Sequence, residues 1–208
     1  HGKRHGHALD RNTAASSLHV MLLAAGSSTR FGSPKQLADI AGRPMLARTL
    51  DTVLQLERRH PVTVVLGADG ELLEPLVRNV SAHVAFNPDH AQGMASSIRV
   101  GLAQAPFDAR GALIALADQV AVTAGDLRQL VSRWEQQHDR IVAALYYGTI
   151  GVPAIFPADL FRELAELTGD RGARVLLSRY PERVIGVPMP SAAQDIDTPG
   201  DLPVSTPS

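Results

Sequence analysis

The stretch LHVMLLAAGSSTRFGSPKQL, residues 18–37, decides the fold class. Residues 18–25 are almost entirely apolar, without the alternation of a half-exposed strand, which is typical of a buried parallel strand. A loop that contains Gly26, Gly32 and several hydroxyl residues follows this strand directly. Ligands of parallel α/β sheets bind outside the carboxyl ends of the strands, so the sequence predicts a binding loop here.

Strands and helices are expected to alternate along the rest of the chain. Short apolar or β-branched runs predict strands at 62–66, 82–87, 111–117, 141–146 and 184–188. Apolar residues at helical spacing predict helices at 44–59, 70–79, 94–105, 157–167 and 170–180. A possible capping box of Thr123 and Asp126 opens another helix that runs to about His138. This order predicts an α/β fold, a doubly wound, mostly parallel, Rossmann-like sheet with helices on both faces.

The length of 208 residues favours one domain. We expect residues 17–202 to form it, between a disordered polar arm at 1–16 and a loose tail at 203–208. The chain has no cysteine, which excludes disulfides, thiolate metal sites and a cysteine nucleophile. A net charge of −1 provides no basic field for nucleic acid or an anionic membrane.

No apolar run reaches the ~18 residues that a membrane span needs. The first residues, HGKRHGH, lack the apolar region of a signal peptide. We therefore expect a soluble enzyme or binding protein in the cytoplasm.

The loop after the first strand has the composition of a phosphate-binding segment. Glycine lets backbone amides approach an anion, and Arg30 and Lys35 can neutralise phosphate oxygens. Lys35 and Lys3 are the only lysines beside eighteen arginines, which suggests that position 35 needs a compact ammonium. The loop is no P-loop, because Phe31 stands where the second glycine belongs, and Ser28 likewise breaks the dinucleotide pattern G-x-G-x-x-G.

Acidic residues follow in two places. Asp118 ends the apolar run 111–117, where a carboxylate can hold a divalent cation, although such an aspartate is often only a turn residue. Asp195 and Asp197 point the same way if their segment is extended, and the alternative is an Asp-rich turn.

Two further segments carry polar groups near glycines. Gly93 opens a helix whose free amides and serine hydroxyls can meet a ligand, or the serines can simply cap the helix. In Gly169–Arg174, Asp170 can cap the next helix, and Arg171 and Arg174 form a solvated face or receive an anionic substrate group.

Five motifs together resemble those of the molybdenum cofactor cytidylyltransferases, within the nucleotidyltransferase superfamily. In chain order they are LAAGSSTRFGSPKQL at 23–37, GMASSIRVGL at 93–102, LADQV at 116–120, GDRGAR at 169–174 and DIDTPGD at 195–201. The first is specific for the superfamily, and the set of five is characteristic of the molybdopterin branch. The resemblance covers about residues 18–202.

The resemblance implies roles for particular residues. Lys35, Asp118 and Asp197 become the catalytic residues, and the two aspartates become ligands of Mg²⁺. Arg171 and Arg174 are possible acceptor-binding residues. The nucleotide is expected to contact Leu23, Ala24, Ala25, Gly26, Ser27, Arg30, Gly32 and Lys35, with Gly93 and Ser97 reading the cytosine.

The implied reaction joins CMP from CTP to the terminal phosphate of molybdopterin and releases pyrophosphate. The implied partners of the product are an apo-molybdoenzyme or its chaperone. Two residues depart from the family pattern. Val120 replaces the proline after Asp-Gln, and Val152 replaces an often polar residue of a Gly-x-Pro segment.

Three alternatives remain open at the level of sequence. A guanylyltransferase of this superfamily typically has two glycines where this chain has Ala25 and Gly26. A transferase acting on a sugar or polyol phosphate would use the same nucleotide machinery. A non-catalytic chaperone that delivers the cofactor is disfavoured, because Lys35, Asp118 and Asp197 are intact.

Overall fold

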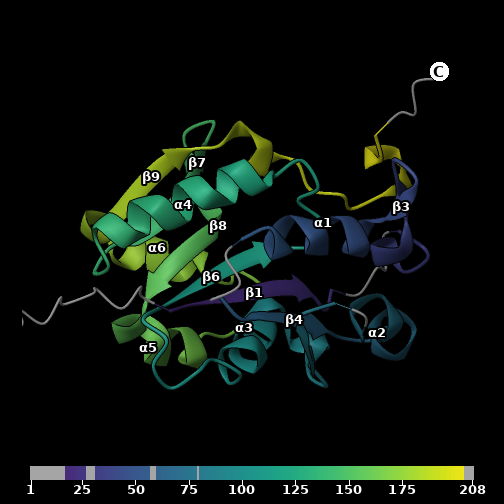
Figure 1. Ribbon diagram of the computed structural model, residues 1–208, viewed down its shortest axis with the longest axis horizontal. Helices are drawn as coiled ribbons and strands as arrows, with labels where there is room; N and C mark the ends of the chain where they lie inside the picture. The colour runs from purple at the N-terminus through teal and green to yellow at the C-terminus, as the bar shows by residue number, and fades with distance from the viewer. Residues whose placement is uncertain (1–16, 27–30, 57–59, 79, 204–208) are drawn as a thin grey trace, which may run out of the picture.

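The computed structural model describes residues 17–26, 31–56, 60–78 and 80–203. Within them a seven-stranded sheet has the order β5-β4-β1-β6-β8-β7-β9 (Figure 1). Its strands are β1 (Leu18–Ala24), β4 (Val62–Leu66), β5 (His83–Phe86), β6 (Gly111–Leu116), β7 (Ile141–Tyr146), β8 (Thr149–Pro157) and β9 (Val184–Pro188). β1 runs parallel to β4 and β6, β4 to β5, and β7 to β9. The predicted mostly parallel α/β class is confirmed.

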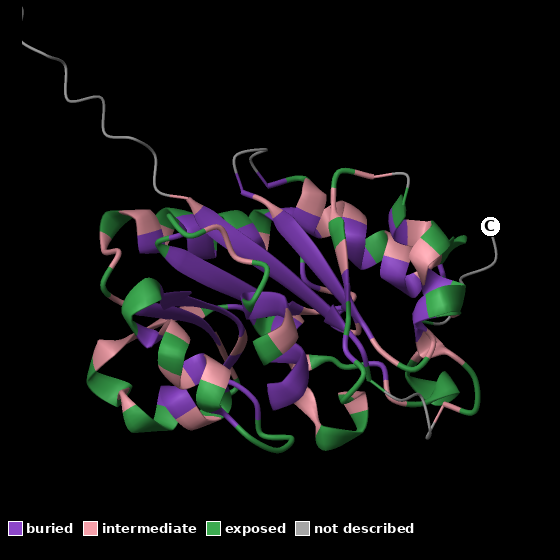
Figure 2. Cartoon of the chain, turned by 90° about the horizontal axis from the view of Figure 1, so that it is seen from below, coloured by how far each residue is buried: buried purple, intermediate pink, exposed green. Residues whose placement is uncertain are grey.

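Helices cover both faces of the sheet, which explains the apolar run of β1. Val20 and Leu22 pack into a core with α1 (Met45–Leu54), α2 (Gly70–Arg78) and α4 (Ala124–Gln136). Met21 and Leu23 pack on the other face with α3 (Met94–Leu102), α5 (Phe161–Glu166) and α6 (Arg174–Arg179). Successive side chains of a strand point to opposite faces, so both must be apolar here. Figure 2 shows the buried strands between the partly exposed helices.

The strand β8 was not predicted, and it departs from a purely parallel sheet. It pairs antiparallel with β6 and β7. Gly151 and Pro153 interrupt the apolar pattern of this segment, and glycine and proline are more typical of loops than of central strands. A Cβ at position 151 would lie 2.6 Å from the hydroxyl oxygen of Tyr146, so a larger residue there would displace the Tyr146 side chain.

Several predicted helix boundaries shift. The helix expected at 157–167 begins only at Phe161, after β8 and the 3₁₀ turn Ala158–Leu160. The helix expected at 170–180 begins at Arg174, because Gly172 adopts a φ of 56°, which is incompatible with a right-handed helix. The helix expected at 44–59 is α1, and its last helical residue is Leu54.

The capping box that opens α4 is confirmed. The amide of Asp126 donates to the Thr123 hydroxyl at 3.0 Å, and the amide of Thr123 donates to the Asp126 carboxylate at 2.9 Å. The predicted arm 1–16 lies outside the described residues, as do positions 204–208 of the predicted tail. None of the described helices combines the length and the apolar character that crossing a bilayer requires.

Candidate active site

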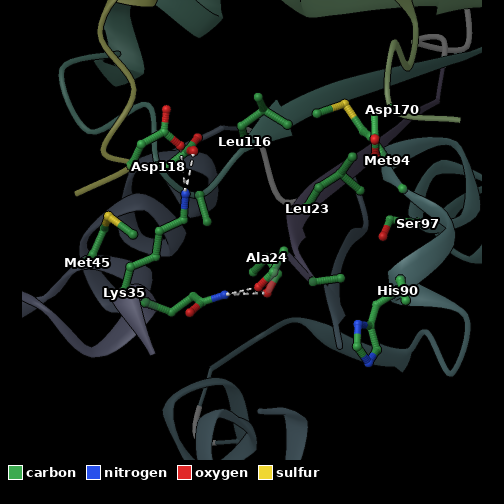
Figure 3. A pocket seen from close by; sticks show the side chains of 17 residues that line it. Leu23, Ala24, Lys35, Met45, His90, Met94, Ser97, Leu116, Asp118 and Asp170 are labelled. Atoms are coloured by element: carbon green, nitrogen blue, oxygen red, sulfur yellow. Dashed lines mark hydrogen bonds and ion pairs between the residues drawn. The ribbon is translucent and has the colours of Figure 1, made fainter. Parts of the chain in front are cut away.

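A cavity of about 450 Å³ opens where the carboxyl ends of β1 and β6 meet (Figure 3). Its floor comes from the end of β1, one end holds Lys35 and Asp118, and the opposite end holds Ser97 and Asp170. The cavity lies where the sequence predicts a binding loop, at the carboxyl end of β1. β1 lies between the parallel strands β4 and β6, and ligands of such sheets bind outside the carboxyl ends of the strands. The lining residues are Leu23, Ala24, Ala25, Gly26, Lys35, Gln36, Met45, His90, Ala91, Gly93, Met94, Ser97, Leu116, Ala117, Asp118, Asp170 and Asp197.

One end of the cavity holds an ammonium group between two carboxylates. Lys35 Nζ lies 3.0 Å from Asp118 Oδ2 and 3.6 Å from Asp197 Oδ1. It also donates to the carbonyl oxygen of Ile196 at 2.8 Å. Only 15% of the Lys35 side chain is exposed, so this lysine is no solvated surface residue.

Local hydrogen bonds aim these groups at the cavity. Lys35 begins a short 3₁₀ helix, Lys35–Leu37, and the next residue, Gln36, is buried. The side-chain amide of Gln36 donates to the carbonyl oxygens of Ala24 at 3.0 Å and Gly26 at 3.3 Å, which fastens the end of the loop to β1. The amide of Ile196 donates to the carbonyl oxygen of Asp118 at 3.3 Å, which brings the C-terminal carboxylates beside β6.

Negative charge is in excess at this end. Partial loss of water around its carboxyl group, and then the charges of Asp118 and Asp197, raise the pKa of Asp195 from 3.8 to about 6. Asp118 Oδ1 is buried and has no hydrogen-bond partner among the residues that the structure describes. A buried carboxylate oxygen without a donor is costly, so this atom is suited to a cation.

The donor set fits Mg²⁺ bound together with phosphate. Within the described ranges, no group of three His, Asp or Glu side chains could hold a metal ion alone. Mg²⁺ is usually bound through one or two carboxylates plus substrate phosphates, with waters completing the octahedron. Asp118 and Asp197, both on the cavity wall, provide two carboxylates of this kind.

The opposite end of the cavity presents the hydroxyl group of Ser97, which is fixed by a hydrogen bond from Asn87. Asn87, which is buried, donates its side-chain amide to Ser97 Oγ at 2.9 Å and to Ser96 Oγ at 2.8 Å. Ser96 in turn donates to the carbonyl oxygen of Gly93 at 2.7 Å. Because Ser97 Oγ already accepts from Asn87, its own proton is directed to another acceptor, and Ser97 lines the cavity.

N-capping of α3 by serine, the alternative to a ligand-binding role for these hydroxyls, is not observed. The N-cap is Gly93, with no side-chain cap bond. Its φ of 100° is a left-handed-region value that favours glycine. The serines of this helix therefore serve the cavity wall and the hydrogen bonds behind it.

The structure brings together most of the residues expected at the site. Gly32, with a φ of 78°, belongs to the first loop but is not a lining residue. Ser27 and Arg30 lie outside the described residues. The cavity wall contains Leu23, Ala24, Ala25, Gly26, Lys35, Gly93, Ser97, Asp118 and Asp197.

The two expected acceptor-binding arginines are exposed and do not line the cavity. Arg174 donates to the hydroxyl oxygen of Tyr146 at 3.4 Å, and its charge lowers the pKa of Asp195 against the stronger effects that raise it. Arg174 thus lies outside the cavity wall, whereas Asp170 of the same motif lines the end opposite Lys35.

Sequence reasoning missed two supporting residues, Asn87 and Gln119. Gln119 is buried and donates its side-chain amide to the carbonyl oxygens of Val152 and Ala192, each at 3.0 Å. It thereby ties β8 and the segment before Asp197 to the residue next to Asp118. Both residues act through contacts far apart in the chain, for which no local pattern exists. The available signal was their place near the end of a predicted strand, Asn87 as the last residue of 82–87 and Gln119 two residues after 111–117.

Comparison with known proteins gives one family and several relatives. The model of the MobA-like NTP transferase domain matches residues 20–184. The bifunctional protein GlmU of Mycolicibacterium smegmatis is 38% identical over 122 residues, which is 55% of this chain. The chain spans only about a quarter of that relative, 24% of its length. Nicotine blue oxidoreductase of Paenarthrobacter nicotinovorans is 32% identical over 190 residues, covering 86% of this chain and 91% of that protein.

The fold also matches solved structures. The crystal structure of Rv0371c from Mycobacterium tuberculosis superposes with a TM-score of 0.78 at 30% identity, covering 90% of this chain and 96% of that one. A second structure of Rv0371c is a complex with manganese, with a TM-score of 0.73 at 28% identity over 89% of this chain and 95% of that one. Since the family model matches most of the chain, this chain belongs to the family of MobA-like NTP transferase domains.

Proposed function

We propose that the protein is a Mg²⁺-dependent cytidylyltransferase that joins CMP from CTP to the terminal phosphate of molybdopterin. The observation that carries this proposal is the ammonium of Lys35 between Asp118 and Asp197, at one end of a cavity whose other end presents Ser97. A nucleoside triphosphate has matching ends, a polyanion and a polar base. The five motifs between residues 23 and 201 support the molybdopterin acceptor.

The reaction needs positioning and charge compensation more than a base. An oxygen of the acceptor phosphate attacks the α-phosphorus of CTP, the bond from that phosphorus to the bridging oxygen breaks, and pyrophosphate leaves with the electron pair. The attacking oxygen is already anionic at neutral pH, so no side chain has to remove its proton. The barrier lies in bringing anions together, and fixed cations and amides lower it.

Each residue of the acidic end then has a role. Lys35 holds α- and β-phosphate charge as a point charge, and Gly26 allows the backbone to approach the phosphates. Asp118 and Asp197 would hold Mg²⁺, which supplies neutralisation of phosphate oxygens when bound. Manganese in the Rv0371c complex supports a divalent ion in a protein of this fold.

The acceptor and the partners rest on the motifs. Val152 belongs to the Gly-x-Pro segment that the resemblance links to the acceptor; it does not line the cavity, and its carbonyl oxygen accepts a hydrogen bond from Gln119. A sugar or polyol phosphate is the alternative acceptor, since it needs the same nucleotide machinery. With molybdopterin as acceptor, the product would pass in the cytoplasm to an apo-molybdoenzyme or its chaperone.

A redox activity is a second candidate, favoured by the match to nicotine blue oxidoreductase over 86% of this chain. The paired carboxylates and lysine favour phosphate chemistry, because electron transfer to an organic ring does not require a divalent-cation site. A guanylyltransferase would differ from the proposed enzyme only in the base of the nucleotide that it uses. A non-catalytic chaperone would bind the same ligands without turnover.

One assay separates these functions. The protein is incubated with Mg²⁺, molybdopterin and each of the four nucleoside triphosphates, and products are identified by mass. The expected result is a CMP adduct of molybdopterin with one pyrophosphate per adduct. An adduct with GMP supports the guanylyltransferase. A parallel incubation with nicotine blue and a reduced nicotinamide cofactor tests the redox candidate, which is supported by oxidation of the nicotinamide together with reduction of the dye, without pyrophosphate release in the first incubation.

The buried Ala25 is expected to disfavour the larger guanine base. Its side chain lines the cavity beside the backbone of β1 and is only 4% exposed. We expect Ala25→Gly to raise kcat/KM with GTP by about tenfold and to keep CTP use, since one methyl group in a pocket contributes about 1–3 kcal/mol. Steady-state kinetics with both nucleotides measure this. Equal use of CTP and GTP by the unmodified protein would refute the preference for cytosine.

A further inference from the structure

Asp170 is a charged residue of the cavity that the proposed chemistry does not use. Figure 3 shows it beside Met94 and near Ser97, at the end opposite Lys35. Within the described part of the chain, its carboxylate makes no hydrogen bond or ion pair. It does not cap α6 as the sequence suggested, because the N-cap of that helix is Ala173, without a side-chain bond.

The position of Asp170 is built by its neighbours. A Cβ at Gly93 would collide with Asp170 Oδ1 and come within 2.8 Å of the carbonyl group of Gly169. The amide of Ala95 donates to that carbonyl oxygen at 3.1 Å. A Cβ at Gly172 would lie 2.6 Å from the sulfur of Met94. Two glycines and one backbone hydrogen bond therefore seat the loop 169–172 directly on the start of α3.

The loop contact leaves a hydrogen-bond acceptor and a hydrogen-bond donor at the same end of the cavity. The Asp170 carboxylate can only accept hydrogen bonds, and the Ser97 hydroxyl, which already accepts from Asn87, can donate. Asp170 is exposed, so water solvates its carboxylate in the free protein. A base that binds at this end displaces some of that water, and the lost hydrogen bonds are replaced only if the base offers a donor. The triphosphate end lies at Lys35, so this donor must come from the base.

Cytosine and uracil differ in what they offer to such a pair. Both carry the acceptor O2, but cytosine has an exocyclic amino group at C4, where uracil has a carbonyl oxygen. Aspartate and glutamate accept readily from this amino group. A carboxylate facing the uracil oxygen would leave two acceptors in contact, with no hydrogen between them.

We propose that Asp170 is a specificity residue that accepts a hydrogen bond from the exocyclic amino group of cytosine and thereby excludes UTP. This inference rests on the proposed function, because it assumes that the cavity binds CTP. Ser97 donates to an acceptor that both pyrimidines share, so it contributes affinity without separating them. One such hydrogen-bonded pair corresponds to a preference for CTP over UTP of about 5- to 150-fold.

The test compares CTP and UTP binding by isothermal titration calorimetry, with Mg²⁺ and without acceptor. Asp170→Asn keeps the shape of the side chain, and its amide can donate to the uracil oxygen. We expect this variant to weaken CTP binding and strengthen UTP binding, so that their ratio falls at least tenfold. Ser97→Ala should weaken both nucleotides by a similar factor. Asp108→Asn, at an exposed carboxylate outside the cavity, is the matched charge control and should leave both unchanged.

Three results would overturn the assignment. An unchanged CTP to UTP ratio in a folded Asp170→Asn protein, with CTP still bound, shows that Asp170 does not read the base and leaves the proposed function intact. Stronger binding of both nucleotides by the same factor shows a general charge effect instead. Absence of CTP binding by the unmodified protein overturns the assignment and the proposed function together.

Discussion

Lys35→Ala is expected to lower the rate of pyrophosphate release by about 100- to 1,000-fold at saturating Mg²⁺. Removal of one group aimed at charge that develops in the transition state typically costs about 3–4 kcal/mol. Lys35 Nζ contacts Asp118 at 3.0 Å and Ile196 at 2.8 Å, so the variant also loses some folding stability. That loss is expected to be about 1–3 kcal/mol, since a part-buried acceptor is left without its donor. Initial rates and thermal denaturation measure the two effects separately.

Lys35→Arg is the matched variant for charge. The guanidinium keeps the positive charge but is planar and larger than an ammonium. It has to fit between Asp118 and Asp197 in a space where the lysine side chain is 15% exposed. We expect it to remain folded and to be impaired as well. Unchanged turnover of a folded Lys35→Ala protein would remove Lys35 from the catalytic residues.

Asp118→Asn is expected to abolish metal-dependent turnover, with a loss of about 100-fold or more. The amide keeps the shape of the side chain but not the charge that Mg²⁺ needs. Asp118 Oδ1 is buried and has no hydrogen-bond partner among the described residues, so it is available to bind a cation. A neutral side chain at this position removes that metal ligand. Binding of Mn²⁺ in the presence of CTP, followed by electron paramagnetic resonance, reports the lost site independently of activity.

Asp197→Asn should act in the same direction with a smaller loss of Mn²⁺ affinity. The Asp197 side chain is 40% exposed and that of Asp118 is 18% exposed, so water screens the charge of Asp197 more. The exposed Asp108→Asn controls for the change in net charge. Full Mg²⁺-dependent turnover in either active-site variant would make that residue a turn residue without a role in metal binding.

The sequence predicted the sheet well where its local signals were strong. The apolar run 18–25 and the motif after it placed a parallel strand and a cavity at its carboxyl end, as the structure has them. Lys35, Asp118 and Asp197 lie 83 and 79 positions apart along the chain and nevertheless meet. Lys35 and Asp118 follow β1 and β6, which are adjacent parallel strands whose carboxyl ends share one edge of the sheet. Asp197 is brought to them by the hydrogen bond from the amide of Ile196 to the carbonyl oxygen of Asp118. Their chemical roles stay predictions.

Other features could not be predicted, for physical reasons that differ. β8 was missed because Gly151 and Pro153 interrupt its strand pattern, although glycine is there to admit the Tyr146 side chain. Asn87 forms side-chain hydrogen bonds to residues 9 and 10 positions away, and Gln119 to residues 33 and 73 positions away, which no periodicity encodes. From the sequence, capping of the next helix was one possible role of Asp170, and the contact with Gly93 that places it in the cavity depends on tertiary packing.

A crystal structure of the protein with CTP and Mg²⁺, without acceptor, tests the central claim most directly. The account predicts the triphosphate beside Lys35, a metal ion on Asp118 and Asp197, and the cytosine between Ser97 and Asp170. CTP bound at another surface, or bound in this cavity with its base at Lys35 and its phosphates at Ser97, would contradict it.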